Sequence, residues 1–119
     1  MRKLIYLCCL VIGLSACSSK NTSPLYQSMP IVNIESNIAN AVAVTPADKQ
    51  IAVKNLTNSS IKTAYLLTWY DRNGVTQRAN WQQDELWQHL ILSAKQQVNI
   101  PLSKPTEQSV NYRVYFKAD

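Results

Sequence analysis

The sequence predicts an all-β protein, a small antiparallel immunoglobulin-like β-sandwich of six or seven strands that follows a signal peptide and a tether. Three observations support this fold class. Short runs in which apolar and polar residues alternate recur along the chain and are separated by turn residues. No segment keeps the helical period over the length of a helix. The chain contains only two glycines, which argues against a disordered or loop-dominated protein.

The first sixteen residues have the three parts of a bacterial signal peptide. Met1–Lys3 is positively charged, Leu4–Leu14 is uncharged, and the small residues Ser15 and Ala16 precede Cys17. We therefore predict cleavage after residue 16 and lipidation of Cys17. Two alternatives are a transmembrane anchor, which needs about 20 apolar residues, and an ordinary secretory signal cut at the same place. The apolar run is too short for the first alternative.

The predicted lipid on Cys17 makes a lipid bilayer the first expected partner. Each buried methylene adds about 0.8 kcal/mol, so two or three acyl chains hold a protein far more firmly than one. Ser18 stands where an aspartate retains lipoproteins in the inner membrane of enteric bacteria, so we expect the periplasmic face of the outer membrane. Residues 17–30 are polar and contain two prolines. They are predicted to be a flexible tether that reaches roughly 40 Å.

The cysteines and charges exclude several classes of function. Cys8 and Cys9 leave with the signal peptide and Cys17 becomes a thioether, so we expect no disulfide, no cysteine nucleophile and no thiolate metal ligand. Removal of Arg2 and Lys3 leaves ten basic and seven acidic residues, and the basic residues are scattered singly. A nucleic-acid partner is not predicted, because the chain lacks a basic stripe.

The first half of the predicted domain, residues 31–119, begins with an ambiguous segment. Residues 31–44 mix short apolar runs with asparagines, which indicates two short strands or one broken edge strand. Thr45–Asp48 follows as a turn. Ile51–Leu56 alternates as a half-buried strand does, and a polar turn cluster after it favours a hairpin with Thr63–Tyr70.

The hairpin after Thr63–Tyr70 carries the strongest local signal. Thr63–Tyr70 is apolar on both faces, which is typical of a central strand covered on both sides. Asp71–Gly74 contains Asn-Gly, the dipeptide that favours a tight primed turn, and Asp71 is expected to cap that turn. Val75–Arg78 begins the return strand. A polar loop with Trp81 follows, and Leu86–Leu92 resumes an apolar run.

The last third of the chain predicts two more strands. Ser93–Gln96 is a turn, and Val98–Leu102 is a strand that Pro101 restricts to a sheet edge or to its own end. After a polar loop, Val110–Lys117 alternates most regularly. One face of this strand contains Val110, Tyr112, Val114 and Phe116, and the other contains Asn111, Arg113, Tyr115 and Lys117.

Several of these segments resemble the YcfL-like family of small periplasmic lipoproteins. The resemblance rests on Leu66–Gly74, on Trp87 with Leu90–Leu92, and on Pro105–Phe116 with Arg113. It implies an immunoglobulin-like sandwich anchored in the bacterial envelope. Family genes are often found near one for an outer-membrane lipoprotein that activates peptidoglycan synthesis, which suggests envelope biogenesis by association. The loop with Trp81 departs from the family pattern.

The titratable residues do not form a pattern that indicates catalysis. Asp71, Asp84, Glu85 and His89 are the only group that could meet near one edge, and their spacing shows neither a paired acid and base nor a metal site. We therefore predict no catalytic residue, no metal ligand and no cofactor, and the chain is not expected to be an enzyme.

The aromatic residues give the only other candidates for a functional site. Trp69 and Trp87 are expected to pack in the core, whereas Trp81 and Tyr115, together with Arg113, are candidates for a contact surface. The first functional hypothesis is a lipid-anchored module that binds or scaffolds envelope proteins. The second is a module that binds peptidoglycan or another glycan, since aromatic rings also stack on sugars. A hydrolase is the third and weakest hypothesis.

Overall fold

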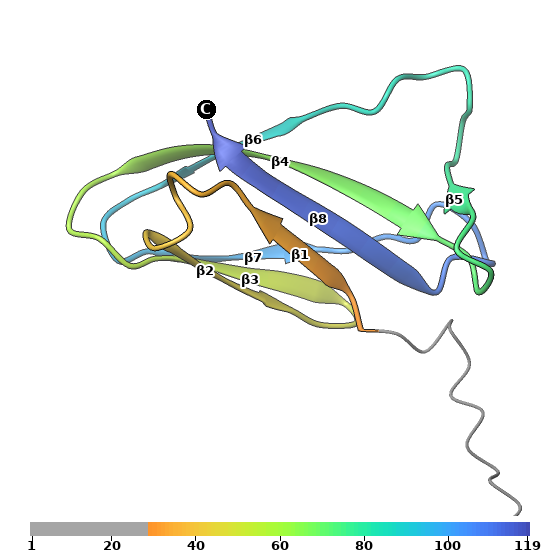
Figure 1. The fold of residues 1–119 in the computed structure, drawn as a ribbon, viewed down its shortest axis with the longest axis horizontal. Helices are drawn as coiled ribbons and strands as arrows, with labels where there is room; N and C mark the ends of the chain where they lie inside the picture. Colours follow the sequence, from red (N-terminus) through yellow and green to blue (C-terminus); the bar gives the residue numbers. More distant parts are fainter. Residues whose placement is uncertain (1–28) are drawn as a thin grey trace, which may run out of the picture.

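A computed structural model describes residues 29–119. The predicted signal peptide, Cys17 and nearly all of the predicted tether lie outside the described residues. Within this range the chain forms eight strands and no helix, and therefore no helix that could span a membrane. The strands are β1 (Ile31–Ile34), β2 (Val42–Pro46), β3 (Gln50–Asn55), β4 (Ile61–Tyr70), β5 (Thr76–Gln77), β6 (Gln88–Leu92), β7 (Gln97–Pro101) and β8 (Asn111–Ala118) (Figure 1).

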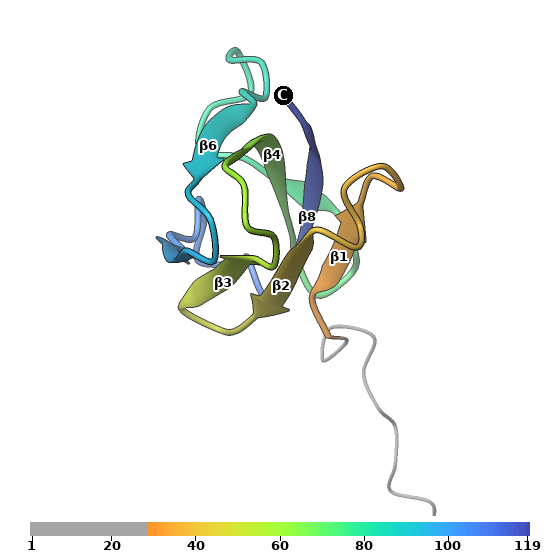
Figure 2. The same ribbon diagram turned by 90° about the vertical axis from the view of Figure 1, so that its left-hand side faces the viewer.

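The strands form two sheets that lie against each other (Figure 2). The larger sheet has the order β1-β8-β4-β5. Strand β6 pairs with the same edge of β4 as β5 does, but along the first half of β4, whereas β5 pairs with its end. The smaller sheet has the order β2-β3-β7. The predicted all-β sandwich is therefore confirmed. The described range contains one strand more than the upper limit predicted from the sequence, and β5 is only two residues long.

The hydrophobic core lies between the two sheets. Trp69, Tyr112, Val114 and Phe116 come from the larger sheet, and facing them are side chains of β2, β3 and β7. Tyr112 also donates a hydrogen bond from its hydroxyl to the carbonyl oxygen of Ala47, at 2.8 Å. Burial raises the pKa of Tyr112, an effect that its hydrogen bond to Ala47 opposes. Strand β8 thus alternates as predicted from Tyr112 to Lys117, with Tyr112, Val114 and Phe116 in the core. The prediction is wrong at the start of the strand, because Val110 precedes β8 and is exposed, whereas Asn111 is buried.

The segment at residues 31–44 forms two strands that belong to different sheets. Ile31–Ile34 pairs with β8 in parallel, and Val42–Pro46 pairs with β3. The turn after β2 begins one residue beyond Pro46, so the strand extends further than predicted. The parallel pairing is the one departure from an antiparallel arrangement among the described strands. Parallel neighbours need a long connection, and here β2 to β7 lie between β1 and β8 in the chain.

The predicted hairpin between Ile51–Leu56 and Thr63–Tyr70 is wrong. Strand β3 pairs with β2 and β7, whereas β4 lies in the other sheet. The polar cluster between them is a crossover, and the buried side chain of Asn55 holds it. Its Nδ2 donates to the carbonyl oxygens of Ser59, Leu92 and Ser93, and its Oδ1 accepts from Thr57. These bonds fix a sheet-to-sheet connection that composition alone does not distinguish from a hairpin turn.

The turn after β4 is a hairpin, as predicted, but not a primed turn. Gly74 has a φ of 80°, whereas Asn73 does not have a positive φ. The Gly74 amide donates to the carbonyl oxygen of Asp71 at 3.0 Å, and the Asp71 amide donates to that of Val75 at 2.9 Å. This is a three-residue hairpin loop with glycine in the left-handed position. Asp71 caps the turn as predicted, because its Oδ1 accepts from the amides of Asn73 and Val75.

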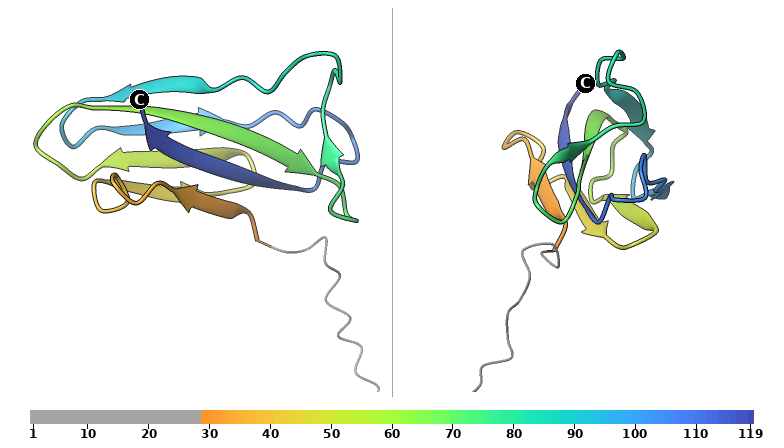
Figure 3. Two further views of the ribbon diagram at one scale, coloured as in Figure 1. Left: turned by 45° about the horizontal axis from the view of Figure 1, so that its top comes forward. Right: turned by 90° about the vertical axis from the view of Figure 1, so that its right-hand side faces the viewer.

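Strand β7 lies at the edge of the smaller sheet and ends at Pro101, which agrees with the restriction predicted for that proline. Between β5 and β6 the chain makes a long excursion away from β4 (Figure 3). This excursion, residues 78–87, leaves the middle of β4 without a strand on that side. The edge of β4 is therefore without a strand partner on that side from Leu66 to Thr68.

Candidate functional site

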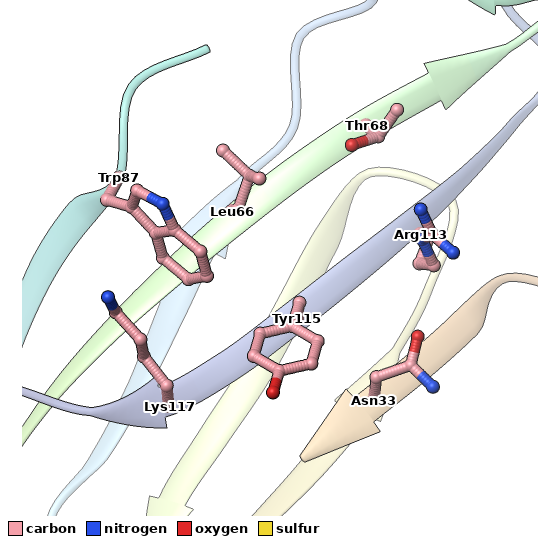
Figure 4. A pocket seen from close by; sticks show the side chains of 7 residues that line it. All are labelled: Asn33, Leu66, Thr68, Trp87, Arg113, Tyr115 and Lys117. Carbon is pink, nitrogen blue, oxygen red and sulfur yellow. The ribbon is translucent and has the colours of Figure 1, made fainter. Parts of the chain in front are cut away.

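A groove of about 530 Å³ lies on the outer face of the larger sheet, opposite the core. We call it the outer groove. It crosses β1, β8 and β4 and is closed at one end by the residue before β6 (Figure 4). Its volume is in the range of sites that bind small ligands or short peptide segments. The lining side chains are Asn33, Leu66, Thr68, Trp87, Arg113, Tyr115 and Lys117.

The pleat of the strands and their register place these side chains together. Arg113, Tyr115 and Lys117 alternate along β8 with the buried residues Val114 and Phe116, so they point away from the core. Tyr115 is paired with Leu66 on one side and with Asn33 on the other. One row of side chains therefore runs across three strands, and the sequence pattern of β8 predicts only its middle member.

Trp87 stands at the end of the outer groove and not in the core, which corrects the prediction. It is half-buried, and its ring lies 5.8 Å from that of Tyr115 in an edge-to-face arrangement. The ammonium group of Lys117 lies over the Trp87 ring, 4.2 Å from its centre. Alternate residues of a strand point to opposite faces, so counting back from the buried Leu92 places Ile91, His89 and Trp87 on the outer face. The sequence therefore contained a signal for an outward Trp87, but its hydrophobicity suggested the core.

The outer groove is electropositive. Its lining contains the cations of Arg113 and Lys117 and no carboxylate. Two acidic residues that contact this end of the chain have partners outside the groove. Glu35 accepts a hydrogen bond from the backbone amide of Ala118 at 3.0 Å, and Asp119 pairs with His89 at 2.7 Å. Among residues 29–119, no side chain forms an ion pair with Arg113.

Trp81 does not belong to the outer groove. It lies in the excursion between β5 and β6, where it is 63% exposed. The guanidinium of Arg78 lies 5.3 Å from the centre of the Trp81 ring and forms an ion pair with Glu85 at 3.1 Å. The structure thus brings together Tyr115 and Arg113 but separates both from Trp81. Tyr115 is 39% exposed, and Arg113 is also exposed.

The titratable residues singled out from the sequence do not meet at one site. Asp71 caps its turn, Glu85 pairs with Arg78, and His89 pairs with Asp119. Asp84 and Glu85 line a smaller hollow of about 210 Å³ under the excursion, and His89 is not part of it. Within the part of the chain that the structure describes, no cluster of three or more histidine, cysteine or acidic side chains could hold a metal ion.

Comparison with known proteins gives a family and no activity. The model of the family described as "Protein of unknown function (DUF1425)" matches residues 27–118. An uncharacterized protein of Haemophilus influenzae is 38% identical over 104 residues, which cover 87% of this chain and 90% of that protein.

Two solved structures are similar to this one. The crystal structure of Campylobacter jejuni cj0090 has a TM-score of 0.61 and 20% identity, covering 76% of this chain and 100% of that chain. A DUF1425 family member from Shewanella sp. pv-4 has a TM-score of 0.50 and 24% identity, covering 66% of this chain and 74% of that chain. At these identities the likeness concerns the fold alone. The family match over most of the described domain and the Haemophilus relative establish that the chain belongs to the DUF1425 family, which is the YcfL-like family.

Proposed function

We propose that this protein is a lipid-anchored module of the bacterial envelope that binds or scaffolds other envelope proteins through the outer groove. The observation that supports the proposal best is the composition of that groove. It combines two aromatic rings, two cations and an apolar floor on a sheet face that the rest of the domain leaves open. Aromatic residues and arginine are enriched where proteins contact one another.

The anchor part of the proposal rests on Cys17, which lies outside the described residues. A lipid there would place the domain at the periplasmic face of the outer membrane, with the tether setting its reach. Replacement Cys17→Ala is expected to abolish metabolic labelling with a fatty acid and to release the protein from membranes. Unchanged labelling and unchanged membrane attachment would show that the anchor is elsewhere.

The contact part of the proposal is tested by crosslinking in cells. A photoreactive amino acid at Tyr115 is expected to give a specific crosslinked partner, because this ring is exposed in the outer groove. The matched control is the same amino acid at Asn99, an exposed position on β7 of the other sheet. A third position, Trp81, tests whether the excursion is part of the same surface. A partner captured equally from Asn99, or none from Tyr115 under varied envelope conditions, refutes the proposal.

A second candidate function is binding of peptidoglycan or another glycan. The pair of rings formed by Trp87 and Tyr115 favours it, because aromatic faces stack on sugars. Retention of the purified protein by isolated sacculi at low salt, abolished by Tyr115→Ala, is the expected result. Equal retention of the Tyr115→Ala variant would exclude the outer groove as the glycan site. Neither candidate function requires a catalytic step, and we assign none to the titratable residues.

A further inference from the structure

We propose that the partner of the outer groove is an extended acidic peptide segment of another protein, with an apolar side chain between two carboxylates. This inference rests on the proposed function, because it names the chemistry of the partner for the same groove. The two carboxylates would be bound by Arg113 and Lys117. The apolar side chain would lie on Tyr115 and Leu66, between the two cations.

The charge of the groove determines the charge of the partner. Arg113 has no ion pair with any residue in the range 29–119, and the groove lining holds no acidic group. A guanidinium presents donors in a planar fork that matches a carboxylate bidentately. A peptide carboxylate would therefore supply the counter-charge that the described part of the chain does not provide. Because Lys117 is a second cation in the same groove, we expect the peptide to carry a second acidic side chain.

The spacing of the cations determines the spacing within the peptide. Arg113, Tyr115 and Lys117 are alternate residues of β8, so the Cα atoms of the two cationic residues lie about 13 Å apart along the strand at roughly 3.4 Å per residue. An extended peptide laid along β8 has the same rise and also places alternate side chains on one face. Its residues i and i+4 would then meet the two cations, and residue i+2 would meet Tyr115.

The charge of the groove fits an acidic peptide better than it fits a neutral glycan. Stacking on a sugar needs an open aromatic face, but the Lys117 ammonium already lies over the Trp87 ring (Figure 4). Arg113 and Lys117 also carry charges that a neutral glycan cannot neutralise, whereas carboxylates can. The chain's own tether is also a poor occupant, because residues 17–30 include Lys20 and no acidic residue.

The test is selection from a library of random peptides displayed on phage, with the purified full chain immobilised. We expect the enriched peptides to carry acidic residues four positions apart around an apolar residue. Synthetic versions with glutamine in place of the acidic residues are expected to bind about tenfold more weakly or worse, as is the Arg113→Gln variant with the original peptides. Lys54→Gln, at an exposed position on β3 of the other sheet, should bind as the parent does.

Three results would overturn the inference. Enriched peptides without acidic residues, or acidic peptides that bind Arg113→Gln and Lys117→Gln as tightly as the parent, would show that the cations are not the ligands. No enrichment, together with Tyr115-dependent retention on sacculi, would assign the groove to a glycan. The failure of the proposed function itself is distinguishable, because it is the absence of a specific crosslink from Tyr115 in cells. Arg113→Gln changes an exposed residue and is expected to keep the parent's urea midpoint. Lys117→Gln loses the contact with Trp87, so its binding is compared only after its urea midpoint has been measured.

Discussion

Replacement of Asn55 tests whether one polar side chain holds the crossover between the two sheets. Asn55 is fully buried at the end of β3. Its amide nitrogen lies 2.7 Å, 3.2 Å and 3.0 Å from the carbonyl oxygens of Ser59, Leu92 and Ser93, and its carbonyl oxygen accepts from both the amide and the hydroxyl of Thr57. Leu92 and Ser93 end or follow β6, so this side chain connects the smaller sheet to the larger one.

The magnitude follows from the number of bonds that the side chain can make. An amide NH₂ has two hydrogens, so the three carbonyl contacts amount to two full bonds, and the two bonds from Thr57 bring the total to four. At about 1 kcal/mol each, Asn55→Ala should lower the free energy of unfolding by about 4 kcal/mol, less what water recovers at the partly exposed groups. This is a large part of the roughly 5–15 kcal/mol that stabilises a typical domain.

The assay is urea denaturation of the full chain, followed by tryptophan fluorescence. Asn58→Ala is the matched control, since Asn58 lies in the same crossover but is exposed, and its expected effect is within about 0.5 kcal/mol. Asn55→Asp is a second test. It removes the amide donors and places a carboxylate next to three carbonyl oxygens, so it should also lower the free energy of unfolding. The variant should regain stability as the pH falls and the carboxylate is protonated. A loss below about 1 kcal/mol for Asn55→Ala would refute the reasoning.

Three further predictions concern the turn, the tyrosines and an ion pair. Gly74→Ala should cost about 1 kcal/mol in urea denaturation, because φ is 80° there and no atom would contact the new methyl group, so the cost is that of the backbone. Burial raises the pKa of Tyr65 and of Tyr112 in the folded state. Their contribution to the free energy of unfolding is therefore complete below their unfolded pKa of about 10 and is lost as the pH rises through the folded pKa. Stability measured across this alkaline range should fall, and by less in Tyr112→Phe. Glu85→Gln should change stability by less than about 1 kcal/mol, since its pair with Arg78 is partly exposed.

Strand content was predictable from the sequence because the pleat repeats every two residues and leaves a local signal. The alternation of Val114 and Phe116 with Arg113 and Tyr115 gave the inner and outer faces of β8 correctly. Strand pairing was less predictable. A cluster of four polar residues is compatible with a hairpin or with a crossover, and the bonds of Asn55 that decide between them join positions 37 and 38 residues apart.

The same distinction explains the candidate site. Tyr115 and Arg113 were predictable as surface residues, since one strand's pattern suffices for that. The outer groove also needs Asn33 from a parallel strand and Trp87 from the far edge, and both depend on strand order. Trp87 was misplaced because its size suggested the core, although period-two alternation from Leu92 pointed outward. Trp81 was grouped with Tyr115 on exposure alone, which carries no information on proximity.

A basic outer face has a simpler explanation than ligand binding, because charged residues keep an open sheet face soluble. Substitutions at the two cations of the outer groove can distinguish solubility from ligand binding, and Arg113 is the better position for this test. The Lys117 ammonium lies over Trp87, a contact worth about 0.5–1 kcal/mol at an exposed site, so its replacement perturbs the domain as well as a partner. Arg113 has no ion pair within residues 29–119. If solubility is its only role, Arg113→Lys should be equivalent in every assay, since the charge is kept. If it binds a carboxylate, Arg113→Lys should weaken the acidic peptides selected on the parent, because lysine lacks the planar fork.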